Sequence, residues 1–418
     1  QSIHINASFE HLNESHTAGL SKDDSWNSTT NVFHGYAMNV GSYTIYFSLK
    51  NTRDYRWADN ASASSSKGVV FNITRKSLKV PTIVGNEANT TKTVMFQEKD
   101  DNPVSQSMQI APIDSDSLVK VVGFTSVNDT IRLVWNYDRE NKLYECSASN
   151  VYILNNAVQS YYITLAIPDT ANYEWEDHTQ SNRTFYFRIE PRALSVPVLS
   201  QRIESEDEEG DKVVEDKPAT GNKITVTYDS SVFNFALSNM VSVLGYVTNN
   251  GTYLNGDLKD SYDADSSTLM LSASHVYQNS AYNTIDYSIT VSLRNKSNYC
   301  WNDGNRQVAD KVYYIRIDKK KLALPTIADN DGSTNMYYKY FPYDNDTHEM
   351  TLQNIDTAWI SYASWDITKL EVAELEGNKL RATTLSEKQG NYRVDLTLKD
   401  NLNTCWSDNA RDAKYYYI

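Results

Sequence analysis

The stretch NYCWNDG occupies residues 298–304, and a related stretch, NTCWSDN, occupies residues 403–409. What they share with the rest of the chain is a tryptophan followed two residues later by an aspartate. This pair occurs four times, and a tyrosine stands fourteen residues before each tryptophan. The tyrosines and tryptophans are Tyr43 and Trp57, Tyr161 and Trp175, Tyr287 and Trp301, and Tyr392 and Trp406. Such constant spacing indicates an internal repeat.

Each repeat continues from its tyrosine with alternating apolar residues, for example Tyr287, Ile289, Val291 and Leu293. This period of two predicts a β-strand with one buried face. A second apolar run follows, and after it comes a segment that contains a proline. These segments are KSLKVPT (76–82), RALSVPV (192–198) and KKLALPT (320–326). Because proline lacks a ladder N–H group, we interpret each segment as the end of one domain leading into the first strand of the next.

The repeat predicts an all-β fold of four tandem immunoglobulin-like β-sandwiches, the first of them incomplete, in an extended array. The expected domains are 1–75, which is partial, then 76–190, 191–319 and 320–418, the last without the end of its final strand. Two segments leave alternatives open. Residues 366–380 fit strands or one or two helical turns, and the acidic run 204–216 is typical of a solvated loop, with a cation site as the alternative.

Physical chemistry gives the repeated tryptophan a structural role. Burial of an indole removes about 200 Å² from water, and truncation of a buried tryptophan costs about 3–5 kcal/mol. We therefore predict that Trp57, Trp175, Trp301 and Trp406 are the core anchors of the four sandwiches. The aspartate two residues later is expected to begin a turn, because its carboxylate can accept backbone N–H groups.

We interpret the cysteines as incidental to the repeated motif. Cys300 and Cys405 directly precede their tryptophans, where the other repeats have Arg56 and Glu174. A position that accepts charged residues is expected to face outward. Two equivalent positions in different domains lie too far apart for a mutual disulfide, and Cys146 has no obvious mate. Unpaired thiols are expected, and disulfides between molecules are the alternative.

The combined pattern resembles the tandem immunoglobulin-like repeats of large secreted bacterial surface proteins, especially those of anaerobic Gram-positive organisms. The third repeat matches best, through DYSITVSLRNKSNYCWNDG (286–304) and KKLALPT (320–326). The fourth repeat departs from the pattern at Thr404 and Asn409, and the first lacks its front half. The resemblance implies stalks, spacers or adhesive modules, and it supplies no active site.

Composition and missing motifs exclude several other classes of protein. A net charge of −14 with scattered basic residues argues against a nucleic-acid partner. No apolar stretch approaches the roughly 18 residues of a transmembrane segment. The seven histidines form no zinc motif, and neither a phosphate loop nor a nucleophile elbow is present. DNDGS (329–333) is only faintly similar to a calcium loop. We expect no catalytic residue, no metal, no cofactor and no enzymatic activity.

Eleven Asn-x-Ser/Thr sequons are a modest excess for such a polar chain. They are at Asn6, Asn13, Asn27, Asn60, Asn72, Asn89, Asn128, Asn182, Asn250, Asn295 and Asn345. They are possible N-glycosylation sites if the source organism modifies asparagine, and otherwise polar surface residues.

These observations predict an extracellular structural or adhesive protein of the cell surface. The final KYYYI (414–418) aligns with KVYYI (311–315), so the last strand stops early and the first domain is short. One explanation is a longer chain. The other is head-to-tail self-association into a filament, because an incomplete sandwich exposes a strand edge. Other surface proteins or glycans are further expected partners. The alternative function is a glycan-binding module array, accessory to an enzyme region outside this sequence.

Overall fold

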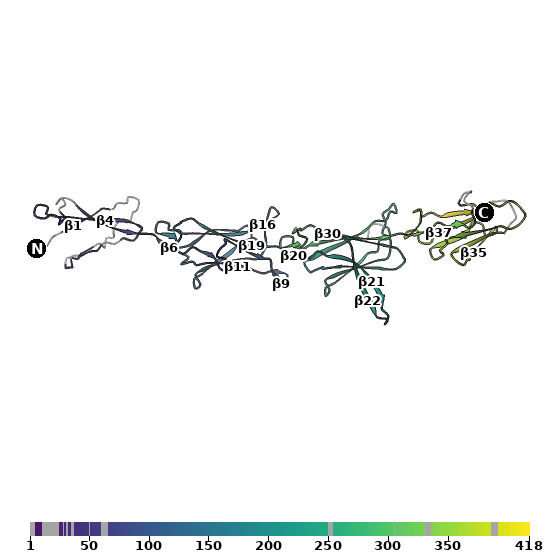
Figure 1. Cartoon of the computed structure of the whole chain (residues 1–418), viewed down its shortest axis with the longest axis horizontal. Coiled ribbons are helices and arrows are strands. Elements are labelled where there is room, and N and C mark those ends of the chain that lie inside the picture. Colours follow the sequence, from purple (N-terminus) through teal and green to yellow (C-terminus); the bar gives the residue numbers. More distant parts are fainter. Residues whose placement is uncertain are drawn as a thin grey trace. The chain divides into compact units, whose positions relative to one another are not determined.

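The computed structural model shows an all-β protein, as the repeat predicts. It describes residues 5–10, 25–27, 29–30, 32–34, 37–49, 51–59, 66–249, 254–304, 306–330, 336–385 and 392–418. Every regular element in these residues is a β-strand, arranged as tandem immunoglobulin-like β-sandwiches (Figure 1). The chain divides into two compact units, Gln1–Arg192 and Ala193–Ile418. Each unit contains two of the four repeats.

The first repeat forms a single antiparallel sheet in the described residues, with strand order β1-β4-β5. Its strands are β1 (Ile5–Glu10), β4 (Gly41–Leu49) and β5 (Lys67–Ile73), and a short hairpin is formed by β2 (Ser25–Asn27) and β3 (Val32–His34). Tyr43 and Ile45 of β4 are buried.

The second repeat packs two four-stranded sheets face to face. One sheet has the order β13-β14-β11-β7 and the other β12-β17-β19-β8. Their bounds are β7 (Thr82–Ile83), β8 (Thr91–Met95), β11 (Gln106–Ala111), β12 (Lys120–Phe124), β13 (Val134–Asp138), β14 (Leu143–Ala148), β17 (Tyr161–Ala166) and β19 (Arg183–Glu190). The short pairs are β9 (Glu98–Lys99) with β10 (Asn102–Pro103), β15 (Tyr152–Leu154) with β16 (Ala157–Gln159), and β6 (Lys76–Leu78) with β18 (Tyr173–Trp175).

The third repeat is built in the same way, with sheets β22-β21-β24-β27-β26 and β23-β30-β28-β25. Their bounds are β21 (Val198–Glu206), β22 (Lys212–Pro218), β23 (Lys223–Thr227), β24 (Phe233–Ser238), β25 (Leu244–Asn249), β26 (Lys259–Asp263), β27 (Thr268–Ala273), β28 (Tyr287–Leu293) and β30 (Lys311–Asp318). The tryptophan-bearing strand is β29 (Tyr299–Trp301), and β20 (Arg192–Leu194) spans the boundary between the two units.

The fourth repeat has sheets β32-β33-β36-β35 and β34-β37-β39. Their bounds are β32 (Thr326–Ile327), β33 (Glu349–Gln353), β34 (Ile360–Ser364), β35 (Leu370–Leu375), β36 (Lys379–Thr384), β37 (Arg393–Leu398) and β39 (Lys414–Tyr417), and β31 (Lys320–Leu322) pairs with β38 (Thr404–Trp406). Residues 366–380, left open between helix and strand, therefore lie in strands and in the two turns before and after β35.

The predicted alternation along the tyrosine-led strand is confirmed in the last three repeats. In β28 every second side chain from Tyr287 to Leu293 is buried, and the residues between are half-buried. The same alternation buries Tyr161, Ile163 and Leu165 in β17. One face of each strand therefore supplies its sandwich core, as a period of two requires.

The turn after each tryptophan contains an ion pair that is repeated four times. The aspartate two residues after the tryptophan binds the basic residue that opens the final strand of its repeat. The pairs are Asp59 with Lys67, Asp177 with Arg183, Asp303 with Lys311, and Asp408 with Lys414. Asp408 also accepts the backbone N–H of Ala410 at 2.9 Å. The aspartate therefore combines the expected turn with a bond to the following strand.

The prediction that Cys300 and Cys405 face outward is wrong. Their exposed fractions are 1% and 3%, and all three cysteines of the chain are buried thiols. For Cys405 the reason is the linker strand β31, because Lys321 of that strand lies opposite Cys405 in a parallel pair. The equivalent Glu174 is half-buried and the equivalent Arg56 is exposed, so the charged residues stand where this position is more open to solvent.

The acidic run is a β-hairpin and not a loop. Strands β21 and β22 pair in antiparallel register from Ser200 opposite Pro218 to Glu206 opposite Lys212, and Arg202 binds Asp216 through two 2.8 Å contacts. All of β22 is exposed, and the hairpin tip projects from the body of the third sandwich (Figure 1). The adjacent Val213 and Val214 favour a strand, and the backbone pairing with β21 holds it although the segment is rich in carboxylates.

Candidate functional site: the junctions between sandwiches

The clearest specialised structure in the described residues is the junction between the third and fourth sandwiches, both in the second unit. Strand β30 ends at Asp318 and β31 begins at Lys320, so a single residue separates the two sandwiches. Strand β31 pairs in parallel with β38. The Lys320 N–H donates to the Asn403 carbonyl at 3.1 Å, and the Ser407 N–H donates to the Leu322 carbonyl at 2.7 Å. The linker is thus part of a sheet.

The side chain of Asn403 joins the two sandwiches directly. Its Oδ1 accepts the Val276 N–H at 2.8 Å and the Asn255 Nδ2–H at 2.8 Å, and both donors belong to the third sandwich. Its own Nδ2 donates to Asp400 Oδ2 at 2.7 Å, which orients the amide. Because Asn403 is 2% exposed, water does not compete for these bonds.

The same arrangement recurs between the first and second repeats, in the first unit. Asn172 Oδ1 accepts the Val40 N–H at 2.8 Å, and Asn172 Nδ2 donates to Asn39 Oδ1 at 3.2 Å and to Asp169 Oδ2 at 2.9 Å. The linker strand β6 pairs in parallel with β18, just as β31 pairs with β38. The same kind of turn, Asp-x-x-Asn with its asparagine three residues before the repeated tryptophan, is therefore part of both junctions.

Aromatic contacts reinforce the junction in the second unit. Tyr228, which follows β23, is 8% exposed, and its ring lies edge-on to Trp359 of the fourth sandwich with centroids 5.9 Å apart. The Tyr228 hydroxyl donates to Asp400 Oδ2 at 3.3 Å. Burial, followed by the charge of Asp400, raises the pKa of Tyr228. Lys320 Nζ lies 4.4 Å from the centre of the Trp359 ring, a cation–π contact.

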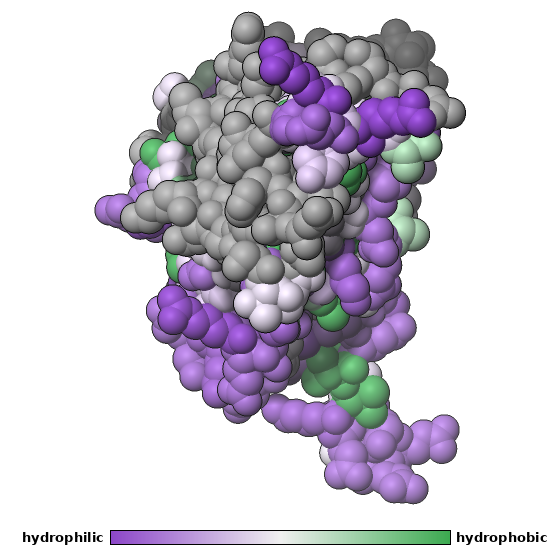
Figure 2. All heavy atoms as spheres, turned by 90° about the vertical axis from the view of Figure 1, so that its left-hand side faces the viewer, coloured by the Kyte–Doolittle hydropathy of each residue, from purple (hydrophilic) through white to green (hydrophobic). Residues whose placement is uncertain are grey.

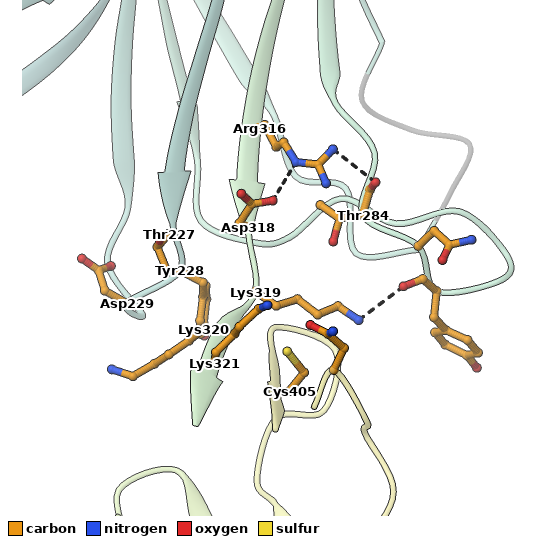
Figure 3. A pocket seen from close by; sticks show the side chains of 13 residues that line it. Thr227, Tyr228, Asp229, Thr284, Arg316, Asp318, Lys319, Lys320, Lys321 and Cys405 are labelled. Atoms are coloured by element: carbon orange, nitrogen blue, oxygen red, sulfur yellow. Dashed lines mark hydrogen bonds and ion pairs between the residues drawn. The ribbon is translucent and has the colours of Figure 1, made fainter. Parts of the chain in front are cut away.

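A polar pocket of about 890 Å³ opens beside this junction, lined by residues of both sandwiches (Figure 3). Arg316 is neutralised within it by Asp318 at 2.6 Å and Asp286 at 3.2 Å. Lys319 Nζ donates to the Tyr282 carbonyl at 3.3 Å, and Arg411 stacks 4.0 Å from the centre of the Tyr282 ring. Burial, and then the charge of Arg411, lowers the pKa of Lys319. Four basic residues and two aspartates line the pocket.

A serine, a histidine and an aspartate meet nearby, but not in the order of a catalytic triad. Asp257 accepts bonds from Ser274, from His275 Nδ1 at 2.8 Å and from the Tyr287 hydroxyl at 2.9 Å. The Ser274 hydroxyl contacts the same His275 Nδ1, at 2.9 Å. A triad needs the two ring nitrogens of histidine between serine and aspartate. This cluster instead holds the segment that presents the Val276 N–H to Asn403.

In the described ranges, no three histidine, cysteine or acidic side chains converge to hold a metal ion. Most of the DNDGS segment, residues 331–333, lies outside those ranges. No helix that the structure describes has the length and apolarity to span a membrane.

The structure places the predicted core anchors in two different environments. The indoles of Trp175, Trp301 and Trp406 are 0% exposed, and each donates its Nε1–H to a backbone carbonyl, that of Ser181, Ala309 and Asp412 respectively. Trp57 is only half-buried. The described part of the first repeat provides one main sheet to cover it, whereas the other repeats provide two.

Sequons lie on exposed surface wherever their side chains are described. These are Asn27, Asn72, Asn89, Asn128, Asn182, Asn295 and Asn345. The side chain of Asn6 and the whole of Asn13, Asn60 and Asn250 lie outside the described residues. Sequence reasoning missed the roles of Asn172 and Asn403, although each stands in the Asn-Tyr/Thr-x-Trp motif. The signal in the sequence is an aspartate three residues before each asparagine, because the two side chains bond to each other within one turn.

Comparison with known proteins leaves the family open. No protein-family model and no curated protein matches the sequence. Among solved structures, the human desmocollin-1 ectodomain shares 6% identity over 99% of this chain and 71% of its own, with a TM-score of 0.22. Domains 1–4 of protocadherin gamma B7 share 9% over 99% and 91%, with a TM-score of 0.23. Invasin, described as a bacterial integrin-binding protein, shares 11% over 93% and 67%, with a TM-score of 0.21. Likeness at this level carries no argument about function.

Proposed function

We propose that this chain is an extracellular structural or adhesive repeat protein in which hydrogen-bonded junctions hold neighbouring sandwiches together. The observation that carries the proposal is the repeated Asp-x-x-Asn turn, in which the half-buried amide of Asn172 and the buried amide of Asn403 each accept a backbone N–H of the preceding repeat. Flexible linkers would not need such bonds, because they leave neighbouring domains free to reorient. Side chains that bond to the neighbouring sandwich fix its orientation, which favours the function of a spacer or stalk.

Surface properties support a place outside the cell. Among the coloured residues of the face shown in Figure 2, hydrophilic ones predominate and hydrophobic ones stand in small groups. The thiols are buried, and the described sequons are exposed to any glycosylating machinery that the source has. Head-to-tail association of such chains into a filament, or adhesion to other surface proteins and glycans, is the finer form of this proposal.

The junction can be tested by measuring distances across it. Spin labels on introduced cysteines at Val247→Cys and Glu371→Cys place one exposed probe on each sandwich, while the native thiols stay buried. A narrow distance distribution is expected by double electron–electron resonance. Asn403→Ala leaves the Val276 N–H without its acceptor, at a cost of about 1–3 kcal/mol, and should broaden the distribution.

Asn141→Ala is a matched control. Asn141 donates to Asp138 Oδ2 at 2.7 Å in the same kind of turn, but at an exposed hairpin tip away from any junction. It should leave the distribution unchanged. A broad distribution in the unmodified protein, like that of a free hinge, would refute the proposal.

A second candidate function is the binding of an acidic glycan in the junction pocket. It is favoured by Lys319, which lines the pocket, and by the neighbouring Arg411, since neither forms an ion pair with a carboxylate in the described part of a chain of net charge −14. Titration with uronic acid oligosaccharides distinguishes the two candidates. Saturable binding that Lys319→Ala abolishes supports this candidate, and no binding favours the purely structural one.

A further inference from the structure

The projecting hairpin of β21 and β22 leaves one strand edge of the third sandwich open. Strand β22 is the last in the order of its five-stranded sheet, and all seven of its residues are exposed. It pairs with β21 in continuous register, from Ser200 opposite Pro218 to Glu206 opposite Lys212. Bulges and very short strands are two means by which proteins keep edges from pairing, and this edge has neither. Its length therefore allows another strand to pair with it.

The backbone groups that point away from β21 belong to alternate residues of β22. The Ala219 N–H donates to the Leu199 carbonyl at 2.8 Å, so residue 219 turns its backbone groups toward β21. Because this direction alternates along a strand, Lys212, Val214 and Asp216 turn their N–H and carbonyl groups outward. These groups are available to a further strand.

Two copies of one edge strand can pair antiparallel only in certain registers. Residues that lie opposite each other must both turn their backbone groups toward the new partner, or both turn them away. A two-fold pair meets this condition only if one residue lies on the axis, opposite its own copy. Near the middle of β22 the candidates for that residue are Val213, Val214 and Glu215.

The charges of the strand favour the register with Val214 on the axis. In this register Asp211 lies opposite Lys217 of the second copy, and Lys212 lies opposite Asp216 of the second copy. Symmetry repeats both pairs, so opposite charges meet at four places and the two valines meet at the centre. Cross-strand pairs of opposite charge and of β-branched residues stabilise a sheet.

Shifted registers bring like charges together. With Val213 on the axis, Asp211 would face Glu215 of the second copy, and with Glu215 on the axis two carboxylates would meet. Like charges directly opposite in a sheet are destabilising. Charged residues on an edge commonly prevent association, but here their order opposes the shifted registers and permits one.

The same register separates the acidic tips of the two hairpins. Each tip carries Asp207, Glu208 and Glu209. In an antiparallel pair the two tips lie at opposite ends, and each one lies beside residues 219–221 of the other copy, which carry no charge. The excess negative charge of one hairpin therefore does not meet that of the other.

We propose that the outer edge of β22 is a homodimerisation surface, along which two copies of this chain pair antiparallel with Val214 on the two-fold axis. Two five-stranded sheets then form one continuous sheet by strand addition. The contact is isologous, so it closes at two copies. A single strand pair is a small interface, so a weak, concentration-dependent dimer is expected. This pairing goes beyond the proposed function and does not depend on the junctions.

The test reverses charges in the whole chain and measures association by sedimentation velocity over a range of concentrations. The unmodified chain should show a monomer–dimer equilibrium. Lys217→Glu and Asp211→Lys each place like charges opposite each other at two points of the dimer. Each variant alone should therefore associate at least about tenfold more weakly. Mixed in equal amounts, the two variants should form a heterodimer as readily as the unmodified chain dimerises, because every pair is again of opposite charge.

A second variant tests the backbone contact. Val214→Pro removes the outward N–H group on the axis, and it leaves the ladder with β21 intact because that ladder uses the neighbouring residues. The variant should stay monomeric over the same concentrations. Its thermal unfolding should match that of the unmodified chain, which shows that the hairpin still folds.

Lys142→Glu is the control, because it makes the same change of charge at an exposed turn of the second sandwich. This variant should dimerise like the unmodified chain. A chain that stays monomeric at every concentration, or two charge variants that do not associate on mixing, would overturn the inference. A narrow label distance across the third and fourth sandwiches would then still support the proposed function, so the two failures are distinguishable.

Discussion

At the scale of the residue, the repeated tryptophan shows how one side chain combines burial with a satisfied polar group. Trp175, Trp301 and Trp406 place an indole in the core, and the following turn supplies a carbonyl for the ring N–H. The acceptor lies six or eight residues after the tryptophan. Without an acceptor for its N–H group, a buried indole would stabilise the sandwich less, because the unpaired donor costs free energy.

Replacement of these tryptophans should therefore separate the first repeat from the others. We expect Trp175→Ala, Trp301→Ala and Trp406→Ala each to destabilise its own sandwich by about 3–5 kcal/mol, through the cavity and the lost apolar burial. Trp57→Ala should cost less, because Trp57 is half-buried. Urea unfolding followed by hydrogen exchange of each repeat measures the loss. An equal cost at Trp57 would contradict this account.

The thiols are a second property of single residues. Burial raises the pKa of Cys146 to about 12, and burial also raises the pKa of Cys405. Because the thiolate is the reactive species, Cys146 should react with a thiol reagent at pH 8 on the order of a thousandfold more slowly than an exposed cysteine. Denaturation in urea should release all three thiols. Rapid labelling of the native protein would contradict the buried environment.

At the scale of the element, the loop that presents Val276 depends on a single carboxylate. Burial acts to raise the pKa of Asp257, but hydrogen bonds from Ser274, His275 and Tyr287 outweigh it, so this pKa lies below its usual value of 3.8. A lowered folded-state pKa contributes stability that is present above the unfolded-state value and is lost as the pH falls through the folded-state value.

Asp257→Asn should thus destabilise the third sandwich by about 1.5–3 kcal/mol near neutral pH, the range for a hydrogen bond to a charged group. The difference from the unmodified protein should shrink as the pH falls below about 4, where the native carboxylate also becomes protonated. Thermal unfolding between pH 5 and pH 3 measures this. The exposed Asp265→Asn is the control, and a constant difference over that range would contradict the assignment.

Elements also show what sequence reasoning could reach. The strands of β17, β28 and β37 follow from strict alternation, because only one face of a sheet is buried. The hairpin of β21 and β22 was missed, since its charges suggest a solvated loop while its pairing depends on residues up to eighteen positions apart, such as Ser200 and Pro218. The burial of Cys405 was missed because a linker strand from another part of the chain covers it.

At the scale of the whole molecule, repeat spacing predicts the number of sandwiches but not how they meet. The motif around Trp406 contains Asp400 and Asn403, yet nothing in the sequence indicates that the amide points across the junction toward Val276. That contact depends on the position of a loop more than 120 residues earlier in the chain. Sequence spacing reports structure that is local, and a junction is made by segments that are far apart in sequence.

The parallel pairing of entry and exit strands has a consequence for a protein under tension. In the second and third sandwiches the strand near the start, β8 or β23, lies parallel to the final strand, β19 or β30, over five residue pairs. Pulling the chain from both sides slides these two strands past each other, so their ladder bonds must rupture together and not one after another. Such a geometry resists the mechanical extension of each sandwich.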